Sequence, residues 1–170
     1  MLKVRLFKYL LVAVSMVSAS FVVAQSEPAM NFHRLNDRLA TGGHLIEGGA
    51  AELKEQGVTV VINLRDDSPT EEQQQFIDQG IEWINIPVEW RNPESSDYAR
   101  FSEIMSEYED DHVLVQCSSN YRASAMTYLY QVVEEGASEE EAKQHVLEIW
   151  NPDNNETWTN FFNEVKAGAE

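Results

Sequence analysis

The sequence predicts an α/β domain with a mostly parallel central sheet of about four to five strands and helices on both faces. Two observations support this prediction. Short apolar runs, such as residues 58–62 and 113–115, alternate along the chain with segments whose apolar residues recur at helical spacing. Strands that alternate with helices are joined by crossover connections, which place the strands in parallel and the helices on the faces of the sheet.

The amino-terminal half begins with two strand segments separated by a short helix. An extended segment over residues 32–41 leads into two glycines at positions 42–43, which require a turn. A short helix is expected over residues 50–56. The β-branched residues 58–62 then form a strand of the kind that a parallel sheet buries.

A second helix and a further strand follow. The helix is expected to begin at Ser68, with Pro69 at its first position and Glu71 completing a capping box. It ends at Gly80. Residues 81–88 then alternate apolar and polar side chains, as a strand does when one of its faces is better buried than the other.

The carboxyl-terminal half adds one strand and four helices. Residues 113–115 form the strand, and residues 123–135 form an apolar helix that ends at Gly136. A helix that begins at Ser138 ends near Trp150. Two more helices are identified by apolar residues at 3.6-residue spacing: Phe101, Ile104, Met105 and Tyr108 in one, and Trp158, Phe161, Phe162 and Val165 in the other.

Residues 1–24 have the composition of a secretory signal peptide, because three basic residues precede an apolar stretch without an acidic residue. Small residues at Val22 and Ala24 predict cleavage after Ala24. An uncleaved anchor is the alternative, although the apolar stretch is shorter than the roughly 20 residues of a membrane span. We therefore expect an exported, periplasmic protein with a short linker over residues 25–31 and a single domain over residues 32–170.

The acidic composition excludes several classes of partner. The formal net charge is −17, and removal of the three basic residues of the leader lowers it to −20. Nucleic acids and anionic membrane surfaces both need basic patches, so we expect no nucleic-acid binding and no stable membrane insertion after cleavage. The histidines show no metal-ligand spacing, so we predict neither a metal site nor a cofactor; they are His33, His44, His112 and His145.

The single cysteine, Cys117, is the main candidate for chemistry. One cysteine cannot form an intramolecular disulfide, and a lone thiol in an oxidising compartment is a liability unless it is buried or used. Cys117 follows the strand at residues 113–115 and precedes a helix. Helix amino termini and nearby cations lower the pKa of a cysteine from about 8.5 to between roughly 3.5 and 7.5. Cys117 is therefore predicted to be a nucleophile at neutral pH.

Arg122 follows Cys117 after four residues and can offer its planar guanidinium to two oxygens of a bound anion. The intervening residues are expected to bind the substrate; they are Ser118, Ser119, Asn120 and Tyr121. Asn120 stands where a tight loop needs a left-handed backbone, which asparagine tolerates. We predict an anion-binding loop. The alternative is an inert buried thiol at Cys117 and a surface charge at Arg122.

With these motifs, the sequence resembles bacterial protein-tyrosine-phosphatase-like domains related to dual-specificity phosphatases, including the beta-lactamase-hydrolase-like phosphatase-like family. The resemblance covers nearly all of the chain after the leader. It implies a dual-specificity-phosphatase-like fold and an enzyme that hydrolyses phosphate monoesters through a phosphocysteine, with phosphotyrosine as a candidate substrate. The segments that carry it are RLATGG at 38–43, VVINLR at 60–65, IPVEW at 86–90 and the loop at 117–122 with Ala123 and Ser124 behind it.

The resemblance also implies a general acid on another loop, and Glu89 is our first choice because it follows the strand that ends at Val88, where such families place an acidic residue. Three other carboxylates are runners-up: Asp66, Asp67 and Asp97. Arg65, at the carboxyl end of a strand, is a candidate second contact to the substrate. It could equally pair with Asp66 or Glu89.

The sequence departs from the phosphatase pattern at three points, and these leave alternatives open. The loop has four residues between cysteine and arginine instead of five, Gln116 stands where phosphatases usually have histidine, and Ala123 replaces a hydroxyl residue that assists departure of the thiolate. Ser124 is a possible substitute for that hydroxyl. The alternatives are a rhodanese-like sulfurtransferase that carries a persulfide on Cys117, or a catalytically inactive phosphate-binding module. The expected partner is a phosphorylated protein or small molecule.

Overall fold

Strands and helices alternate along the chain as predicted. The structure, a computed structural model, describes residues 27–67 and 69–169. Its elements are, in chain order, β1 (His33–Arg34), β2 (Leu39–Gly42), α1 (Gly49–Glu55), β3 (Val60–Asn63), α2 (Thr70–Asp78), β4 (Glu82–Asn85), α3 (Ser95–Glu107), β5 (Val113–Gln116), α4 (Tyr121–Val133), α5 (Glu139–Leu147), a short 3-10 helix η1 (Pro152–Asn154) and α6 (Glu156–Gly168).

The sheet has five strands in the order β1-β2-β5-β3-β4. The pair β1 and β2 is antiparallel, and the other pairs are parallel. The last residues of the parallel strands lie level across the sheet, because Gln116 is paired with both Gly42 and Asn63, and Asn63 is paired with Asn85. The loops that leave these strands therefore start from one edge of the sheet, which is where ligands bind in parallel α/β proteins.

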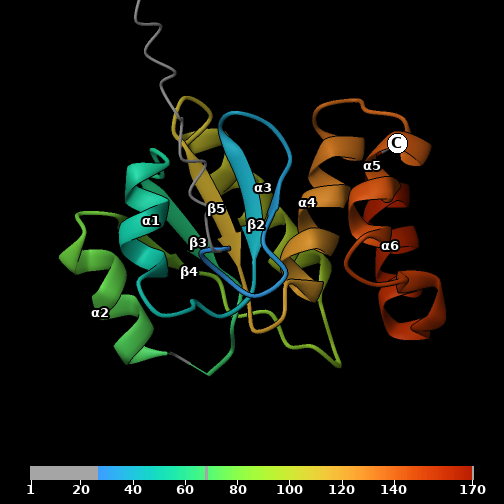
Figure 1. Cartoon of the computed structure of the whole chain (residues 1–170). Helices are drawn as coiled ribbons and strands as arrows, with labels where there is room; N and C mark the ends of the chain where they lie inside the picture. The colour runs from blue at the N-terminus through green and yellow to red at the C-terminus, as the bar shows by residue number, and fades with distance from the viewer. Residues whose placement is uncertain (1–26, 68, 170) are drawn as a thin grey trace, which may run out of the picture.

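Helices cover both faces of the sheet, as predicted (Figure 1). Helices α1 and α2 lie on one face, α3 and α4 lie on the other, and α5 and α6 pack outside α4. Successive side chains of a strand point to opposite faces of the sheet, so each face of the sheet has a hydrophobic core of its own. Val61 and Leu114 belong to the core under α1 and α2, whereas Val60 and Val113 belong to the larger core on the opposite face. The fold is thus a three-layer α/β domain.

Several element boundaries differ from the prediction by a few residues. Helix α4 begins two residues earlier than expected, at Tyr121, so its first turn includes Arg122. Strand β4 stops at Asn85 instead of residue 88, because its partner β3 ends at Asn63. Helix α2 begins at Thr70. The capping box predicted from Ser68 involves a residue that lies outside the described ranges.

Part of the predicted linker over residues 25–31 belongs to the domain. Ala29 is buried and forms a bridge with Leu45, and the N–H of Met30 donates to the carbonyl of His44 at 2.8 Å. The domain therefore begins before residue 32. The predicted signal peptide lies outside the described residues and stays a prediction. Across residues 27–67 and 69–169, no helix is both long and apolar enough to span a membrane.

Candidate active site

Cys117 lies between the carboxyl end of β5 and the amino end of α4. Its side chain is buried, with 1% exposed, and its N–H donates to the carbonyl of Gly42 at 3.1 Å. The first N–H groups of a helix have no helical acceptors, and the helix dipole places positive charge at the same end. The thiol therefore lies where a helix stabilises an anion or a thiolate.

Asn120 has the left-handed backbone that its place in the loop predicts, with φ of 66°. Its side-chain amide donates to the hydroxyl of Thr41 at 2.9 Å and to the carbonyl of Asn31 at 2.6 Å. Asn31 in turn donates to the carbonyl of Ser119 at 3.0 Å. The segment before β1 thus holds the Cys117 loop, a contact that sequence analysis missed because residue 31 had been assigned to a linker.

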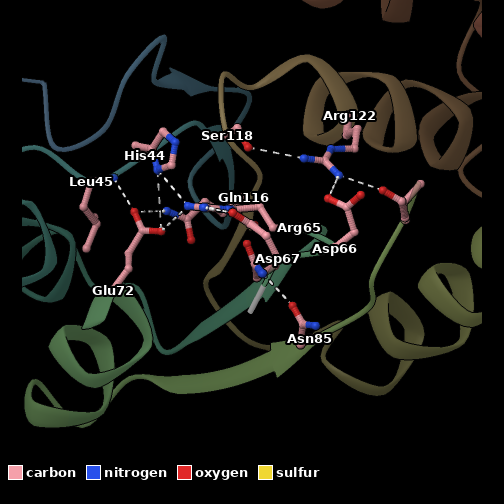
Figure 2. A network of polar contacts seen from close by, with 12 residues as sticks. His44, Leu45, Arg65, Asp66, Asp67, Glu72, Asn85, Gln116, Ser118 and Arg122 are labelled. Atoms are coloured by element: carbon pink, nitrogen blue, oxygen red, sulfur yellow. Dashed lines mark hydrogen bonds and ion pairs between the residues drawn. The ribbon is translucent and has the colours of Figure 1, made fainter. Parts of the chain in front are cut away.

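Arg122 is buried in the first turn of α4, with 8% of its side chain exposed. Its Nη1 donates to Oδ1 of Asp66 at 2.9 Å and to the carbonyl of Val88 at 2.7 Å. Its Nη2 lies 3.3 Å from the hydroxyl oxygen of Ser118. Figure 2 shows the guanidinium between Asp66 and Ser118. Arg122 is thus a guanidinium held at the Cys117 loop and not a free surface charge.

A small cavity joins the cysteine and the arginine. Its volume is about 160 Å³, and its lining consists of Trp90, Cys117, Ser118, Ser119, Tyr121 and Arg122. Typical sites for drug-sized ligands have volumes of about 300–1,000 Å³. The cavity therefore suits a small anionic group together with the atoms attached to it. Of the predicted substrate-binding residues, Ser118, Ser119 and Tyr121 line it, and Asn120 supports the loop from outside.

The predicted general acid, Glu89, is exposed and does not line the cavity. It directly follows Val88, whose carbonyl binds Arg122, so its backbone lies beside the site. Asp66 is the carboxylate that contacts the site, and the hydrogen bond from Arg122 lowers the pKa of Asp66. The other runners-up are engaged elsewhere: Asp67 binds Arg65, and Asp97 accepts the N–H of Glu94 in the cap of α3.

Arg65 does not line the cavity. It is paired on the other side of the β3–α2 loop, where its Nε donates to Asp67 at 2.6 Å and its Nη1 donates to Glu72 at 3.2 Å. Nη1 also contacts Nδ1 of His44 at 2.8 Å. The sequence left an ion pair with Asp66 or Glu89 open, but the partners are two other carboxylates. This placement does not support a direct contact between Arg65 and a substrate.

Gln116 is fully buried and points toward Glu72, away from the Cys117 cavity. Its Nε2 donates to Oε1 of Glu72 and to the carbonyl of Gly43, both at 3.0 Å. Glu72 also accepts the N–H of Leu45 at 2.6 Å (Figure 2). Glu72 was not among the predicted site residues, because acidic residues in the first turn of a helix normally indicate only a favourable dipole interaction.

Ser124 is not available to replace the missing hydroxyl at Ala123. Its hydroxyl is buried and lies 2.7 Å from the carbonyl of Asn120 and 3.1 Å from that of Tyr121. It also accepts the indole N–H of Trp150 at 3.2 Å. A hydroxyl has one proton to donate, and here backbone carbonyls accept it.

Aromatic side chains form one wall of the cavity. Trp90 and Tyr121 line it, and Tyr121 stacks on Trp150 with the ring centroids 5.3 Å apart and an interplanar angle of 19°. Trp158 is buried behind Trp90, at a centroid distance of 5.1 Å. The side chain of Tyr121 remains 38% exposed at the mouth of the cavity. The wall therefore offers apolar surface next to the anion site.

Histidine and acidic side chains do not assemble a metal site in the part of the chain that the structure describes. His33 and His145 contact each other, with ring nitrogens 3.0 Å apart, and Glu148 lies 3.2 Å from the other ring nitrogen of His33. These residues lie on β1 and near α5, away from the residues that line the Cys117 cavity.

Comparison with known proteins relates the chain to one family. Residues 13–162 match the family model described as a DSP-PTPase phosphatase fused to NAD+ kinase. A crystal structure of a DUF442 protein from Shewanella putrefaciens CN-32 is 31% identical, with a TM-score of 0.73 over 82% of this chain and 91% of that one. A search of curated proteins finds no significant match.

More distant structures share the fold. Tk-PTP in its active form is 17% identical, with a TM-score of 0.68 over 81% of this chain and 97% of that one. A mutant of TpbA from P. aeruginosa, solved in complex with pTyr, is 12% identical, with a TM-score of 0.68 over 85% of this chain and 93% of that one. These similarities confirm the predicted fold class.

Proposed function

This chain belongs to the DSP-PTPase phosphatase family and is a hydrolase of phosphate esters, and from this premise we propose that it hydrolyses phosphate monoesters through a phosphocysteine on Cys117. One observation carries the proposal: a single small cavity contains both Cys117 and the buried guanidinium of Arg122, at the amino end of a helix. Nucleophile, cation and backbone donors then converge on one phosphoryl group.

The proposed reaction has two steps. The Cys117 thiolate attacks phosphorus, the ester P–O bond breaks, and a general acid gives a proton to the leaving oxygen. Water then attacks the phosphocysteine, which releases inorganic phosphate and regenerates the thiolate. Arg122 and the N–H groups of the loop bind the phosphoryl oxygens in both steps.

Glu89 is the proposed general acid. Its exposed side chain starts one residue after Val88, whose carbonyl accepts a hydrogen bond from Arg122, so its backbone lies next to the site. The alternative, Asp66, is bound to Arg122, and that hydrogen bond stabilises its ionised form. A group that donates a proton must be protonated first, so the hydrogen bond from Arg122 argues against Asp66 as the acid.

An aryl phosphate such as phosphotyrosine is the proposed substrate. The wall formed by Trp90 and Tyr121 lies beside the thiol, and a planar leaving group can pack against it. The Tyr121→Ala variant should raise KM for an aryl phosphate more than for an alkyl phosphate. Equal changes for both substrates would contradict this assignment.

The decisive experiment compares the wild type with Cys117→Ser on an aryl phosphate and follows the intact mass of the protein. The proposal predicts turnover by the wild type, none by the variant, and a wild-type adduct of one phosphoryl group. Exposure to thiosulfate tests the sulfurtransferase alternative, which predicts a gain of one sulfur atom. Stabilisation by phosphate without turnover of any ester would indicate an inactive binding module.

We also propose that the protein acts in the periplasm after cleavage behind Ala24. The support is the composition of residues 1–24, in which three basic residues precede an apolar stretch without an acidic residue. Fractionation of cells that express the full chain, with amino-terminal sequencing of the periplasmic form, tests this proposal. A mature protein that begins at Met1 in the cytoplasm would contradict it.

A further inference from the structure

Arg122 is held by two acceptors on one of its nitrogens. Both hydrogens of Nη1 are used, one by Oδ1 of Asp66 and one by the carbonyl of Val88. Among the described residues, Nη2 hydrogen-bonds only to Ser118, within the Cys117 loop. The edge of the guanidinium formed by Nε and Nη2 is therefore the edge that remains for an anion.

We infer that Asp66 is a positioning residue that fixes Arg122 with this edge directed at the phosphoryl group, an inference that rests on the proposed function. A free arginine side chain loses rotamer entropy when it is ordered. Asp66 and Val88 order it before the substrate arrives. Binding of phosphate then does not carry that entropic cost.

Asp66 is itself held in place by its neighbours. Arg65 binds Asp67 through two hydrogen bonds and binds the buried Glu72 through a third. Residues on both sides of Asp66 are thereby tied to the domain, as Figure 2 shows. The loop after β3 and the first turn of α2 thus contact both flanks of the Cys117 loop: Asp66 binds Arg122, and Glu72 binds Gln116.

The electrostatics of Asp66 suit an anchor. Its carboxylate is half exposed, and the hydrogen bond from Arg122 lowers its pKa, so it is ionised at neutral pH. An ionised carboxylate accepts a charge-assisted hydrogen bond, which is stronger than a neutral one. If Asp66 only competed with phosphate for Arg122, its negative charge would weaken phosphate binding, and its removal would strengthen that binding. If Asp66 positions Arg122, its removal weakens phosphate binding.

The test measures orthophosphate inhibition and the steady-state constants of Asp66→Ala and Asp66→Asn. For Asp66→Ala we expect KM and the orthophosphate inhibition constant to rise about tenfold, the effect of losing one hydrogen bond to a charged group. Asp66→Asn keeps an acceptor for Nη1 and should recover part of the loss. Asp153→Asn, which removes the charge of a surface carboxylate that binds Lys143, is the matched control and should leave both constants unchanged.

A series of aryl phosphates with different leaving-group pKa values separates positioning from proton donation. The loss in Asp66→Ala should be the same across the series, whereas Glu89→Gln should lose most with the poorest leaving groups. Tighter orthophosphate binding by Asp66→Ala, or a loss that grows with leaving-group pKa, would overturn the inference. A wild type that turns over no ester would refute the proposed function. The inference about Asp66 could still be tested in that case, because a thermal shift measures orthophosphate binding without turnover.

Discussion

Glu72 accepts a hydrogen bond from Gln116 at 3.0 Å, so a buried carboxylate lies beneath the residue that precedes Cys117. The same carboxylate binds Arg65 and the N–H of Leu45. Removing Glu72 takes the acceptor from the N–H of Leu45 and breaks one hydrogen bond each of Gln116 and Arg65 inside a buried network. We expect Glu72→Ala to lower the free energy of unfolding by about 3 kcal/mol in urea denaturation.

The neighbouring exposed residue provides the control for this prediction. Glu71→Ala changes a side chain at the surface in the same helical turn and should shift the free energy of unfolding by less than about 0.5 kcal/mol. Equal urea midpoints for Glu71→Ala and Glu72→Ala would show that the Glu72 network contributes nothing to stability.

Gly43 packs against the Cys117 loop so closely that a side chain has no room. A Cβ atom there would lie 2.8 Å from the carbonyl oxygen of Ser118 and 3.0 Å from the Cα of Ser119. Gly43→Ala must therefore displace the loop. A misplacement of about 1 Å can reduce activity about a hundredfold, and kcat/KM should show such a loss. Gly168→Ala, which meets no atom within 4 Å, should have wild-type activity.

Sequence patterns predicted the layers of the fold and the surroundings of Cys117, because both depend on local order along the chain. Strand, tight loop and helix follow one another directly around Cys117, and the left-handed backbone of Asn120 followed from the loop alone. Apolar spacing also identified the residues of α6 that are buried; they are Trp158, Phe161, Phe162 and Val165.

Contacts between distant segments were not predictable in the same way. Asp66 is 56 residues from Arg122, and Asn120 is 89 residues from Asn31. In a chain with 29 acidic residues, composition cannot identify which carboxylate meets a given arginine. Asp66 meets Arg122 because β3 and β5 end level at the same edge of the sheet, so the loops that follow them lie close together. This arrangement is known only when the register of the sheet is known.

Asn120 combines a left-handed backbone with two hydrogen bonds from its side chain, and two variants separate these contributions. Asn120→Gly keeps the backbone conformation and loses the hydrogen bonds to Asn31 and Thr41. Asn120→Ala also loses the hydrogen bonds, and in addition its Cβ disfavours the left-handed backbone. It should therefore be less stable than Asn120→Gly by about 1 kcal/mol, the cost of a left-handed alanine. Thermal or urea unfolding measures the difference, and an alanine variant as stable as the glycine variant would contradict it.

The pair of Asp67 and Arg65 predicts a pH dependence of stability. Hydrogen bonds from Arg65 lower the pKa of Asp67 in the folded state, below the value of about 3.9 in an unfolded chain. The pair therefore stabilises the fold above pH about 4, and this stabilisation is lost as the pH falls through the folded-state pKa. Asp67→Asn should lower the melting temperature at pH 7 and have less effect at acid pH. A decrease in melting temperature that is the same at pH 7 and at acid pH would refute this prediction. Asp37→Asn, which changes an exposed carboxyl, is the control.

Ionic strength should increase the association of anionic substrates with this acidic protein. The full chain has a formal net charge of −17, which repels phosphate esters at long range, whereas the attraction of Arg122 acts within the buried site. Salt screens the first interaction more than the second, because the Debye length falls from about 30 Å at 0.01 M to about 10 Å at 0.1 M. We expect kcat/KM for an aryl phosphate to rise with sodium chloride over this range, while kcat at saturating substrate stays constant. A steady fall of kcat/KM would show instead that the local field of Arg122 extends into solvent and dominates the approach of the substrate.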